Sequence, residues 1–139
     1  MIEHLRILVV DDDPSMIEVL SAFLENKGYA VDTGENGFEA LELLDQHEYD
    51  LVISDIDMAG MNGFELLKET RSRFPDIGIV LMTAYEEKYP LSEALGAGAD
   101  GYISKPFNLR KFSLVFERAY WSALSRRQDW WDDHAVNEG

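Results

Sequence analysis

Apolar residues follow two alternating patterns along this chain. Short, nearly continuous apolar runs such as LRILVV (5–10) are rich in branched residues and predict strands buried on both faces. Between these runs, apolar residues recur at helical spacing, as Val19, Leu20 and Phe23 do before Gly28. The predicted strands are 5–10, 29–33, 50–54, 77–82 and 101–104. The predicted helices run from Pro14 to Gly28, onward from Gly37, over 63–73, around 90–97 and over 107–125.

The alternation of strand and helix decides the fold class. Five strand–helix pairs follow one another with no hairpin signal, which predicts a parallel sheet covered by helices on both faces. In the second helix, Phe38, Leu41 and Leu44 form the apolar side. The result is a doubly wound α/β fold, whose ligands bind beyond the carboxyl ends of the strands. At 139 residues, the chain is long enough for one domain with a substantial core.

Charge and composition narrow the function classes. The formal net charge is −15, which argues against direct binding to nucleic acid. The chain has no cysteine, which excludes a disulfide framework, a thiolate zinc site and a cysteine nucleophile. The N-terminal MIEHLRILVV lacks the features of a signal peptide, and no apolar run is as long as a membrane span. We therefore expect a cytoplasmic protein that does not enter the membrane.

Polar residues follow four of the five predicted strands. In a parallel sheet these strand ends meet at one edge, so we expect the side chains to lie close together. A polar residue at any single strand end is unremarkable, but complementary chemistry at four ends is not expected by chance. The residues are Asp11 and Asp12 after the first strand, Asp55 after the third, Thr83 after the fourth and Lys105 after the fifth.

The chemistry of this cluster favours a metal ion and a phosphoryl group. Each pair of carboxylates 4 Å apart would repel by about 4 kcal/mol at an effective dielectric constant of 20. A site of this kind shares protons or holds a hard cation, and oxygen-only ligands with open positions suit Mg²⁺. Lys105 adds a fixed positive charge and Thr83 a hydroxyl donor, as a phosphoryl group requires. The central carboxylate can itself be the nucleophile and form an aspartyl phosphate.

Four segments of the chain resemble a known family. LVVDDDP, SDIDMAGMNG, LMTA and YISKPF are similar, in this order, to the signature segments of the response-regulator receiver domain of two-component signalling. The similarity covers about residues 4–125. It implies a flavodoxin-like (βα)5 fold with strand order 2-1-3-4-5. It also implies a receiver domain over 1–125, followed by a tail or truncated linker over 126–139.

The resemblance assigns roles around the phosphorylation site. It implies that Asp55 is the phosphoacceptor and that Lys105 contacts the phosphoryl group. It implies that Asp12 ligates Mg²⁺ directly, that Asp11 acts mainly through water and that the backbone carbonyl of Asp57 completes the protein's share of the metal shell.

The resemblance also implies a switch. Thr83 and Tyr102 correspond to the family's switch pair, and Lys105–Pro106 to a peptide bond that is cis in the family. Thr83 would turn toward the new phosphoryl group and the Tyr102 ring would fill the vacated space, changing the face of the fourth helix, fifth strand and fifth helix. Without the surrounding motif, Tyr102 would be interpreted as a partly buried aromatic at a strand edge.

The chain departs from the family pattern at the loop after Asp55. Ala59 stands where the family usually has proline, which leaves the unfolded loop freer. Asp57 and Tyr85 occupy the positions that in the family tune how fast water removes the phosphoryl group. We hypothesise that Tyr85 partly screens the site and moderates hydrolysis.

The predicted function is a phosphorylation-activated switch that catalyses only its own phosphorylation and dephosphorylation. Its partners would be a histidine kinase or phosphotransfer protein and a downstream protein, with a homodimer through the same output face as a further candidate. One alternative is a phosphatase of the haloacid-dehalogenase type, suggested by the DxD of VISDIDM, although its paired metal-binding acids should follow that strand. Another is a receiver excised from a larger regulator. A scaffold that has lost phosphorylation is a third.

The C-terminal segment SRRQDWWDDHAVNEG is too short for an output domain. Trp130 and Trp131 are adjacent and cannot share one helix face. Either one of them packs on the last helix, or the pair marks a docking patch, a dimer contact or the start of a linker. The histidines His4, His47 and His134 are expected at the surface. GENG (34–37) is interpreted as a turn and not as a phosphate-binding loop.

Overall fold

The fold is built on a parallel sheet of five strands in the order β2-β1-β3-β4-β5. The computed structural model describes residues 4–127. The strands are β1 (Arg6–Val10), β2 (Ala30–Gly34), β3 (Leu51–Asp55), β4 (Gly78–Thr83) and β5 (Gly101–Ser104). Every neighbouring pair is parallel, which confirms the doubly wound α/β fold and the expected strand order.

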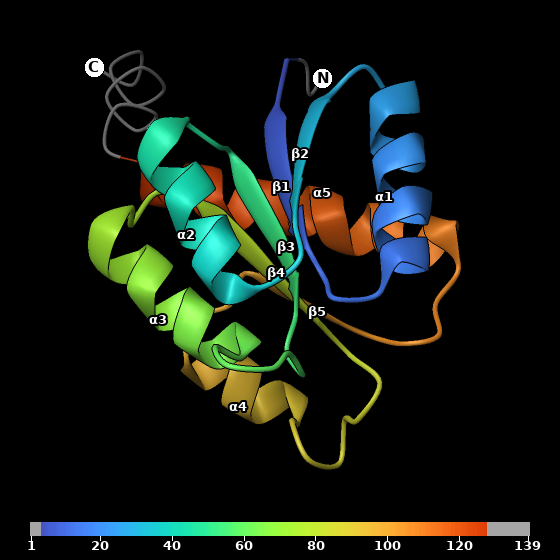
Figure 1. Cartoon of the computed structure of the whole chain (residues 1–139), viewed down its shortest axis with the longest axis vertical. Coiled ribbons are helices and arrows are strands. Elements are labelled where there is room, and N and C mark those ends of the chain that lie inside the picture. Colours follow the sequence, from blue (N-terminus) through green and yellow to red (C-terminus); the bar gives the residue numbers. More distant parts are fainter. Residues whose placement is uncertain (1–3, 128–139) are drawn as a thin grey trace, which may run out of the picture.

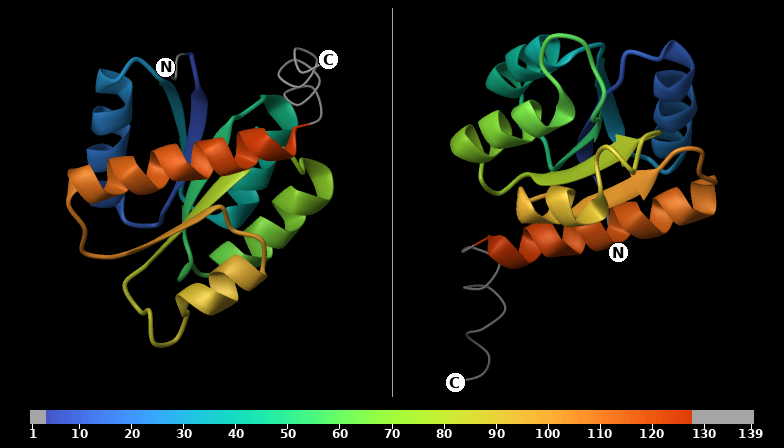
Figure 2. Two further views of the ribbon diagram at one scale, coloured as in Figure 1. Left: turned by 180° about the vertical axis from the view of Figure 1, so that it is seen from behind. Right: turned by 90° about the horizontal axis from the view of Figure 1, so that it is seen from below.

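Five helices cover the two faces of this sheet (Figures 1 and 2). Helices α1 and α5 pack on one face, and α2, α3 and α4 lie on the other. The helices are α1 (Pro14–Asn26), α2 (Gly37–Gln46), α3 (Gly63–Arg73), α4 (Leu91–Gly96) and α5 (Leu109–Arg126). The last helix, α5, ends at Arg126, one residue beyond the predicted domain boundary at residue 125. Trp130, Trp131 and His134 lie outside the described residues.

Alternating side chains of the central strands form two hydrophobic cores. In β1, Leu8 and Val10 join the core under α2 and α3, whereas Ile7 and Val9 join the core under α1 and α5. All residues of β3 and β4 are buried, as expected for strands covered on both faces. The strand ends therefore emerge from a closely packed support.

Helix starts are fixed by side-chain caps that place the loops at the carboxyl edge. Asp13, Asn36 and Asn108 each accept a hydrogen bond from a backbone N–H of the first turn of α1, α2 and α5. Asn62 and Glu65 form a reciprocal capping box at the start of α3. The cap at Asn108 explains why α5 starts at Leu109 and not at the predicted residue 107. Helix α4 is short, and its N-cap Pro90 provides no side-chain cap.

Two apolar residues do not take the positions that helical spacing predicted. Phe38 of α2 is 59% exposed and Val19 of α1 is 49% exposed. The other predicted apolar positions of α2 do contact the core, because Leu44 is buried and Leu41 packs against it, and Ala40 adds a buried position that was not predicted. Phe38 lies in the first turn of α2, above the sheet edge, so its ring extends beyond the core.

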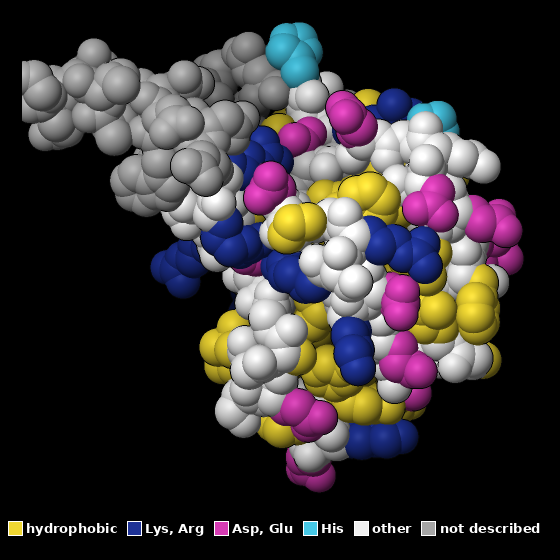
Figure 3. All heavy atoms as spheres, turned by 90° about the vertical axis from the view of Figure 1, so that its left-hand side faces the viewer, with side chains coloured by type: hydrophobic (Ala, Val, Ile, Leu, Met, Phe, Trp, Pro, Cys, Tyr) yellow, Lys and Arg dark blue, Asp and Glu magenta, His cyan; other side chains and the backbone are white. Residues whose placement is uncertain are grey.

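The described surface mixes charges of both signs. On the side of the molecule where α2 and α3 lie, basic and acidic side chains are interspersed (Figure 3). Arg73 of α3, for example, pairs with Asp45 at 3.4 Å and with Glu69 at 3.3 Å. The acidic surplus of the chain is thus partly neutralised on this side. Within residues 4–127, no helix has the length and apolar character needed to cross a membrane.

Candidate functional site at the carboxyl edge of the sheet

Three carboxylates converge where β1 and β3 end. Carboxylate oxygens of Asp11, Asp12 and Asp55 all lie within 4.8 Å of one another. The register of the sheet explains this, because Val10 pairs with Ser54 and the next residue of each strand carries an acid. Asp11 and Asp55 are buried and Asp12 is exposed, so the cluster opens to solvent on one side. The predicted convergence of these acids is confirmed.

Lys105 supplies the positive charge of the cluster. Its Nζ lies 2.8 Å from Oδ2 of Asp11 and 3.4 Å from Oδ1 of Asp55, and its side chain is 15% exposed. The other oxygen of Asp11 accepts a hydrogen bond from the backbone N–H of Asp13 at 3.0 Å. Because both oxygens of Asp11 already have donors, Asp11 is held more rigidly than its exposed neighbour Asp12. The peptide bond between Lys105 and Pro106 is cis, as the family resemblance implied.

The electrostatics of the cluster distinguish its acids from its base. Burial raises the pKa of the Asp55 carboxyl to about 6, the charge of Lys105 opposes this rise, and Asp11 adds to it. Burial alone would lower the pKa of Lys105, but its hydrogen bond to Asp11 and the charges of Asp55 and Asp11 raise it overall. Lys105 is therefore a permanent cation, and Asp55 is a carboxylate whose charge is only partly compensated.

The donor set fits a hard divalent cation. It consists of carboxylate oxygens without nitrogen or sulfur, partly buried and open to water on one side, which suits Mg²⁺. Asp57, the next acid along the chain, has an exposed side chain. Among residues 4–127, its backbone carbonyl accepts no hydrogen bond and is free to act as a ligand.

The two predicted switch residues lie on neighbouring strands but bind different parts of one loop. Thr83, at the end of β4, is buried, and its Oγ1 accepts a hydrogen bond from the N–H of Tyr85 at 2.8 Å. The half-buried Tyr102 of β5 donates its hydroxyl to the backbone carbonyl of Tyr89 at 2.7 Å. Both bonds tie the strands to the loop between β4 and α4. Tyr85 itself is 55% exposed at the edge of the site.

Sequence reasoning missed three residues that support this loop. The Tyr89 carbonyl receives the Tyr102 hydroxyl, and its ring packs against Phe64 of α3 with centroids 5.7 Å apart. Ser104, beside Lys105, donates a hydrogen bond to Glu86 at 2.8 Å. A backbone acceptor, a serine at a strand end and an acidic loop residue have no sequence pattern that distinguishes them, so only the three-dimensional arrangement could identify them.

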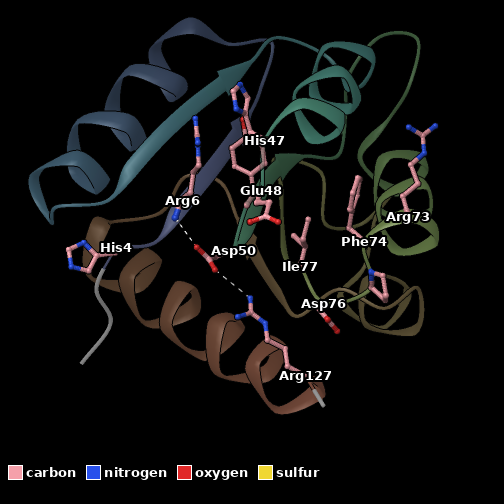
Figure 4. Close-up of a pocket in the computed structure, with 12 residues that line it drawn as sticks. His4, Arg6, His47, Glu48, Asp50, Arg73, Phe74, Asp76, Ile77 and Arg127 are labelled. Atoms are coloured by element: carbon pink, nitrogen blue, oxygen red, sulfur yellow. Dashed lines mark hydrogen bonds and ion pairs between the residues drawn. The ribbon is translucent and has the colours of Figure 1, made fainter. Parts of the chain in front are cut away.

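A separate hollow of about 620 Å³ lies at the opposite, amino-terminal edge of the sheet (Figure 4). Asp50 accepts a hydrogen bond there from the N–H of Arg6 at 2.9 Å and contacts Arg127 at 3.5 Å. His4 and His47 lie at its rim and are exposed, as expected. None of the predicted site residues lines this hollow, so the carboxyl edge remains the candidate site.

Comparison with known proteins gives the same result as the geometry. A family model described as the response regulator receiver domain matches residues 7–116. The chain is 43% identical over 117 residues to the transcriptional regulatory protein ZraR of Klebsiella oxytoca, covering 84% of this chain and 26% of that protein. It is 40% identical over 111 residues to the DNA-binding transcriptional regulator NtrC of Escherichia coli, covering 80% and 24%. The chain thus spans about a quarter of the length of these curated relatives.

Solved structures show the same architecture. A CheY-like receiver domain protein from Methanospirillum hungatei matches with a TM-score of 0.82 and 29% identity, covering 90% of this chain and 100% of that one. The response regulator protein TrrA of Thermotoga maritima, in complex with Mg²⁺-BeF, matches with a TM-score of 0.74 and 41% identity, covering 82% and 97%.

Proposed function

This chain belongs to the response regulator receiver domain family, the signalling switches of two-component systems, and we propose that Asp55 is its phosphoacceptor. The observation that carries this proposal is the position of Lys105, whose ammonium contacts both Asp55 and Asp11. An ammonium fixed beside a carboxylate nucleophile can neutralise the phosphoryl oxygens as they approach. Members of this family act as switches and not as dedicated enzymes, and the chemistry proposed here is limited to the domain's own phosphorylation and dephosphorylation.

In the proposed reaction, the donor is a phosphohistidine of a histidine kinase or phosphotransfer protein. A carboxylate oxygen of Asp55 forms a bond to phosphorus while the bond between phosphorus and the histidine nitrogen breaks. The leaving imidazole keeps the electron pair of that bond and takes a proton from solvent. Because the pKa of Asp55 is about 6, its carboxyl is mostly ionised, and able to react, at pH values above about 6. Lys105 keeps its proton and holds the transferred group in place.

We assign the cation site to Asp12, Asp55 and the backbone carbonyl of Asp57, with Asp11 acting mainly through water. The different surroundings of the two acids support this division, because Asp11 is buried and bonded on both oxygens whereas Asp12 is exposed. A bound Mg²⁺ would offset the repulsion among the carboxylates and the charge of the phosphoryl oxygens.

The proposed response to phosphorylation runs through Thr83 and Tyr102. An aspartyl phosphate adds acceptor oxygens, toward which the Thr83 hydroxyl would turn, leaving the N–H of Tyr85 to a new partner. The loop before α4 would then shift, and with it the Tyr89 carbonyl that holds Tyr102. The output surface would be the face of α4, β5 and α5, which exposes the apolar side chains of Leu91 and Leu95.

This output face would bind a downstream protein or a second copy of the chain. A receiver excised from a larger regulator remains compatible with the described residues, and we expect any DNA contact of a longer protein to lie outside them, because the net charge of this chain is −15. We further propose that the protein acts in the cytoplasm, where kinases of this signalling system deliver phosphoryl groups.

The test is phosphorylation with a small phosphodonor. The protein is incubated with Mg²⁺ and acetyl phosphate, and one acid-stable, base-labile phosphoryl group is expected on Asp55 by mass spectrometry. Asp55→Asn should remain unmodified. Modification of that variant to the same extent would refute the assignment. The family assignment argues against a haloacid-dehalogenase-type phosphatase, and steady turnover of p-nitrophenyl phosphate would revive that alternative.

A further inference from the structure

The loop after Asp55 and the turn before α2 interlock through reciprocal contacts. A Cβ at Gly37 would lie only 2.7 Å from Sδ of Met61, and a Cβ at Gly60 only 3.1 Å from Cε2 of Phe38. Each glycine therefore leaves space that the neighbouring side chain of the other segment occupies. Gly37 and Phe38 start α2, and Gly60 and Met61 lie between β3 and α3, so two loops separated in sequence support each other at the carboxyl edge.

This support matters because the loop has few restraints of its own. Its ends are closed by a hydrogen bond from the N–H of Gly63 to the carbonyl of Ile56 at 2.8 Å. Met58 is 6% exposed and anchors the first half in the core. From Ala59 to Met61, among the described residues, no backbone group forms a hydrogen bond within the protein. Gly60 has φ +82°, a conformation that other residues rarely adopt. The contacts with the α2 turn are thus what restrains the second half.

Hydrophobic burial does not account for Phe38. Phe38 is 59% exposed, so its contribution to the core is small, and yet its ring lies against Gly60, the residue of the loop with a positive φ. A large ring in this position limits where Gly60 can move. Met61, which is partly buried beside the core, limits the following residue in the same way.

We propose that Phe38 and Met61 are positioning residues for the divalent-cation site, because they restrain residues 59–61, the stretch of the loop that begins two residues after the Asp57 carbonyl. This inference rests on the proposed function, in which that carbonyl is a ligand. A loop that is already restrained loses little conformational freedom when the ion binds, whereas a released loop must be ordered at that step. If truncation frees the backbone of about one residue, that residue must be ordered when Mg²⁺ binds. The conformational entropy lost in ordering one residue lowers a binding constant about fivefold or more, so we expect Mg²⁺ binding to weaken about fivefold.

The experiment measures Mg²⁺ affinity of the full chain without a phosphodonor. The amide chemical shifts of residues 57–62 are followed as Mg²⁺ alone is added. Phe38→Ala is expected to weaken binding about fivefold, and Phe38→Leu, which keeps an apolar contact, is expected to bind nearly as the unmodified chain does. Val19→Ala is the matched control, because Val19 is a similarly exposed apolar residue on a different helix. Without the ion, hydrogen exchange of the Met58 and Gly63 amides, which both donate to the Ile56 carbonyl, should be faster in Phe38→Ala only.

The outcomes separate the possible explanations. Equal Mg²⁺ affinity of Phe38→Ala and the unmodified chain would overturn the inference and leave the proposed function standing. Equal weakening by Val19→Ala would also overturn it, since the effect would then be one of general stability. A loss confined to transfer from a protein phosphodonor, with normal Mg²⁺ affinity, would make Phe38 a partner contact instead. No Mg²⁺ binding by the unmodified chain would overturn the proposed cation site itself.

Discussion

The ammonium of Lys105 lies 2.8 Å from a carboxylate oxygen of Asp11, a residue 94 positions earlier in the chain. This bond joins the ends of β5 and β1, the two strands of the site that are farthest apart in sequence. Asp11 is fully buried, and among the described residues Lys105 is the cation that pairs with it. The bond therefore serves the stability of the metal-free protein as well as the proposed chemistry.

Replacing Lys105 by methionine should destabilise the metal-free protein by about 3 kcal/mol, because the buried Asp11 carboxylate would lose its counterion. Mg²⁺ should restore more stability to Lys105→Met than to the unmodified chain, since the ion would offset a larger repulsion. Urea unfolding with and without Mg²⁺ measures both effects. If Mg²⁺ raised the free energy of unfolding by the same amount in both proteins, this account of the cluster would be contradicted.

Replacing Asp55 by asparagine should stabilise the metal-free protein at neutral pH. Burial raises the pKa of this carboxyl from 3.8 to about 6 in the folded state, so the folded protein binds its proton more tightly than the unfolded chain does. Stability is then lost as the pH rises from about 4 through 6, by at most about 3 kcal/mol. Asparagine has no charge to lose, so Asp55→Asn avoids this loss of stability. The difference in free energy of unfolding between the variant and the unmodified chain should disappear below about pH 4. Asp76→Asn, at an exposed position, is the control in the same unfolding experiments.

Asp100 is the opposite case, because its pKa is held below the usual value. Burial alone would raise this pKa, but hydrogen bonds from Arg126, the N–H of Ile79 and Ser122, together with the charge of Arg71, lower it overall. Asp100→Asn should cost about 3 kcal/mol at pH 7 by leaving Arg71 unpaired. The stability from Asp100 is present above pH 3.8 and is lost as the pH falls through its folded pKa. The difference in free energy of unfolding between the unmodified chain and Asp100→Asn should therefore decrease in acid. A difference that does not depend on pH would contradict the stabilising role of the ionised Asp100.

Tyr85 is proposed to moderate hydrolysis of the phosphoryl group by partly screening the site. Truncation to alanine in Tyr85→Ala should shorten the phosphoryl half-life, measured after the phosphodonor is removed. Because Tyr85 is 55% exposed, the change should affect stability little. An unchanged phosphoryl half-life would contradict the hypothesis that Tyr85 slows hydrolysis.

Ala59→Pro should raise the free energy of unfolding by about 0.4–1 kcal/mol, because proline restricts the unfolded chain. Among the described residues, the N–H of Ala59 donates no hydrogen bond that proline would remove. Thermal unfolding of the two proteins gives the comparison. A lower melting temperature for Ala59→Pro would mean that the loop backbone does not accept the proline geometry.

The position of the site could be predicted from the sequence for a simple reason. A parallel sheet brings all of its carboxyl ends to one edge, so Asp11, Asp55 and Lys105 had to meet once the strands were recognised. The caps at Asn36, Asn62 and Asn108 were equally local, since each asparagine binds an N–H three residues later.

Contacts between distant side chains could not be predicted in this way. The pairing of Arg71 and Arg126 with Asp100 joins α3, α5 and the start of β5, and no spacing in the sequence relates these residues. Helical periodicity placed Phe38 on the apolar side of α2, whereas the first-turn position above the sheet edge leaves its ring exposed. Periodicity reports which side of a helix is apolar but not where that side runs beyond the core.

The hollow at the amino-terminal edge has a practical consequence. Its rim includes His4 and Arg127, the first and last described residues, and it lies at the amino-terminal edge of the sheet, whereas Asp55 ends β3 at the carboxyl edge. A fluorophore or a solid support coupled next to either residue would therefore stand away from the carboxylates. Molecules immobilised in this orientation would all present the proposed phosphoryl-accepting edge to the bulk solution, which suits surface-based measurements of kinase binding.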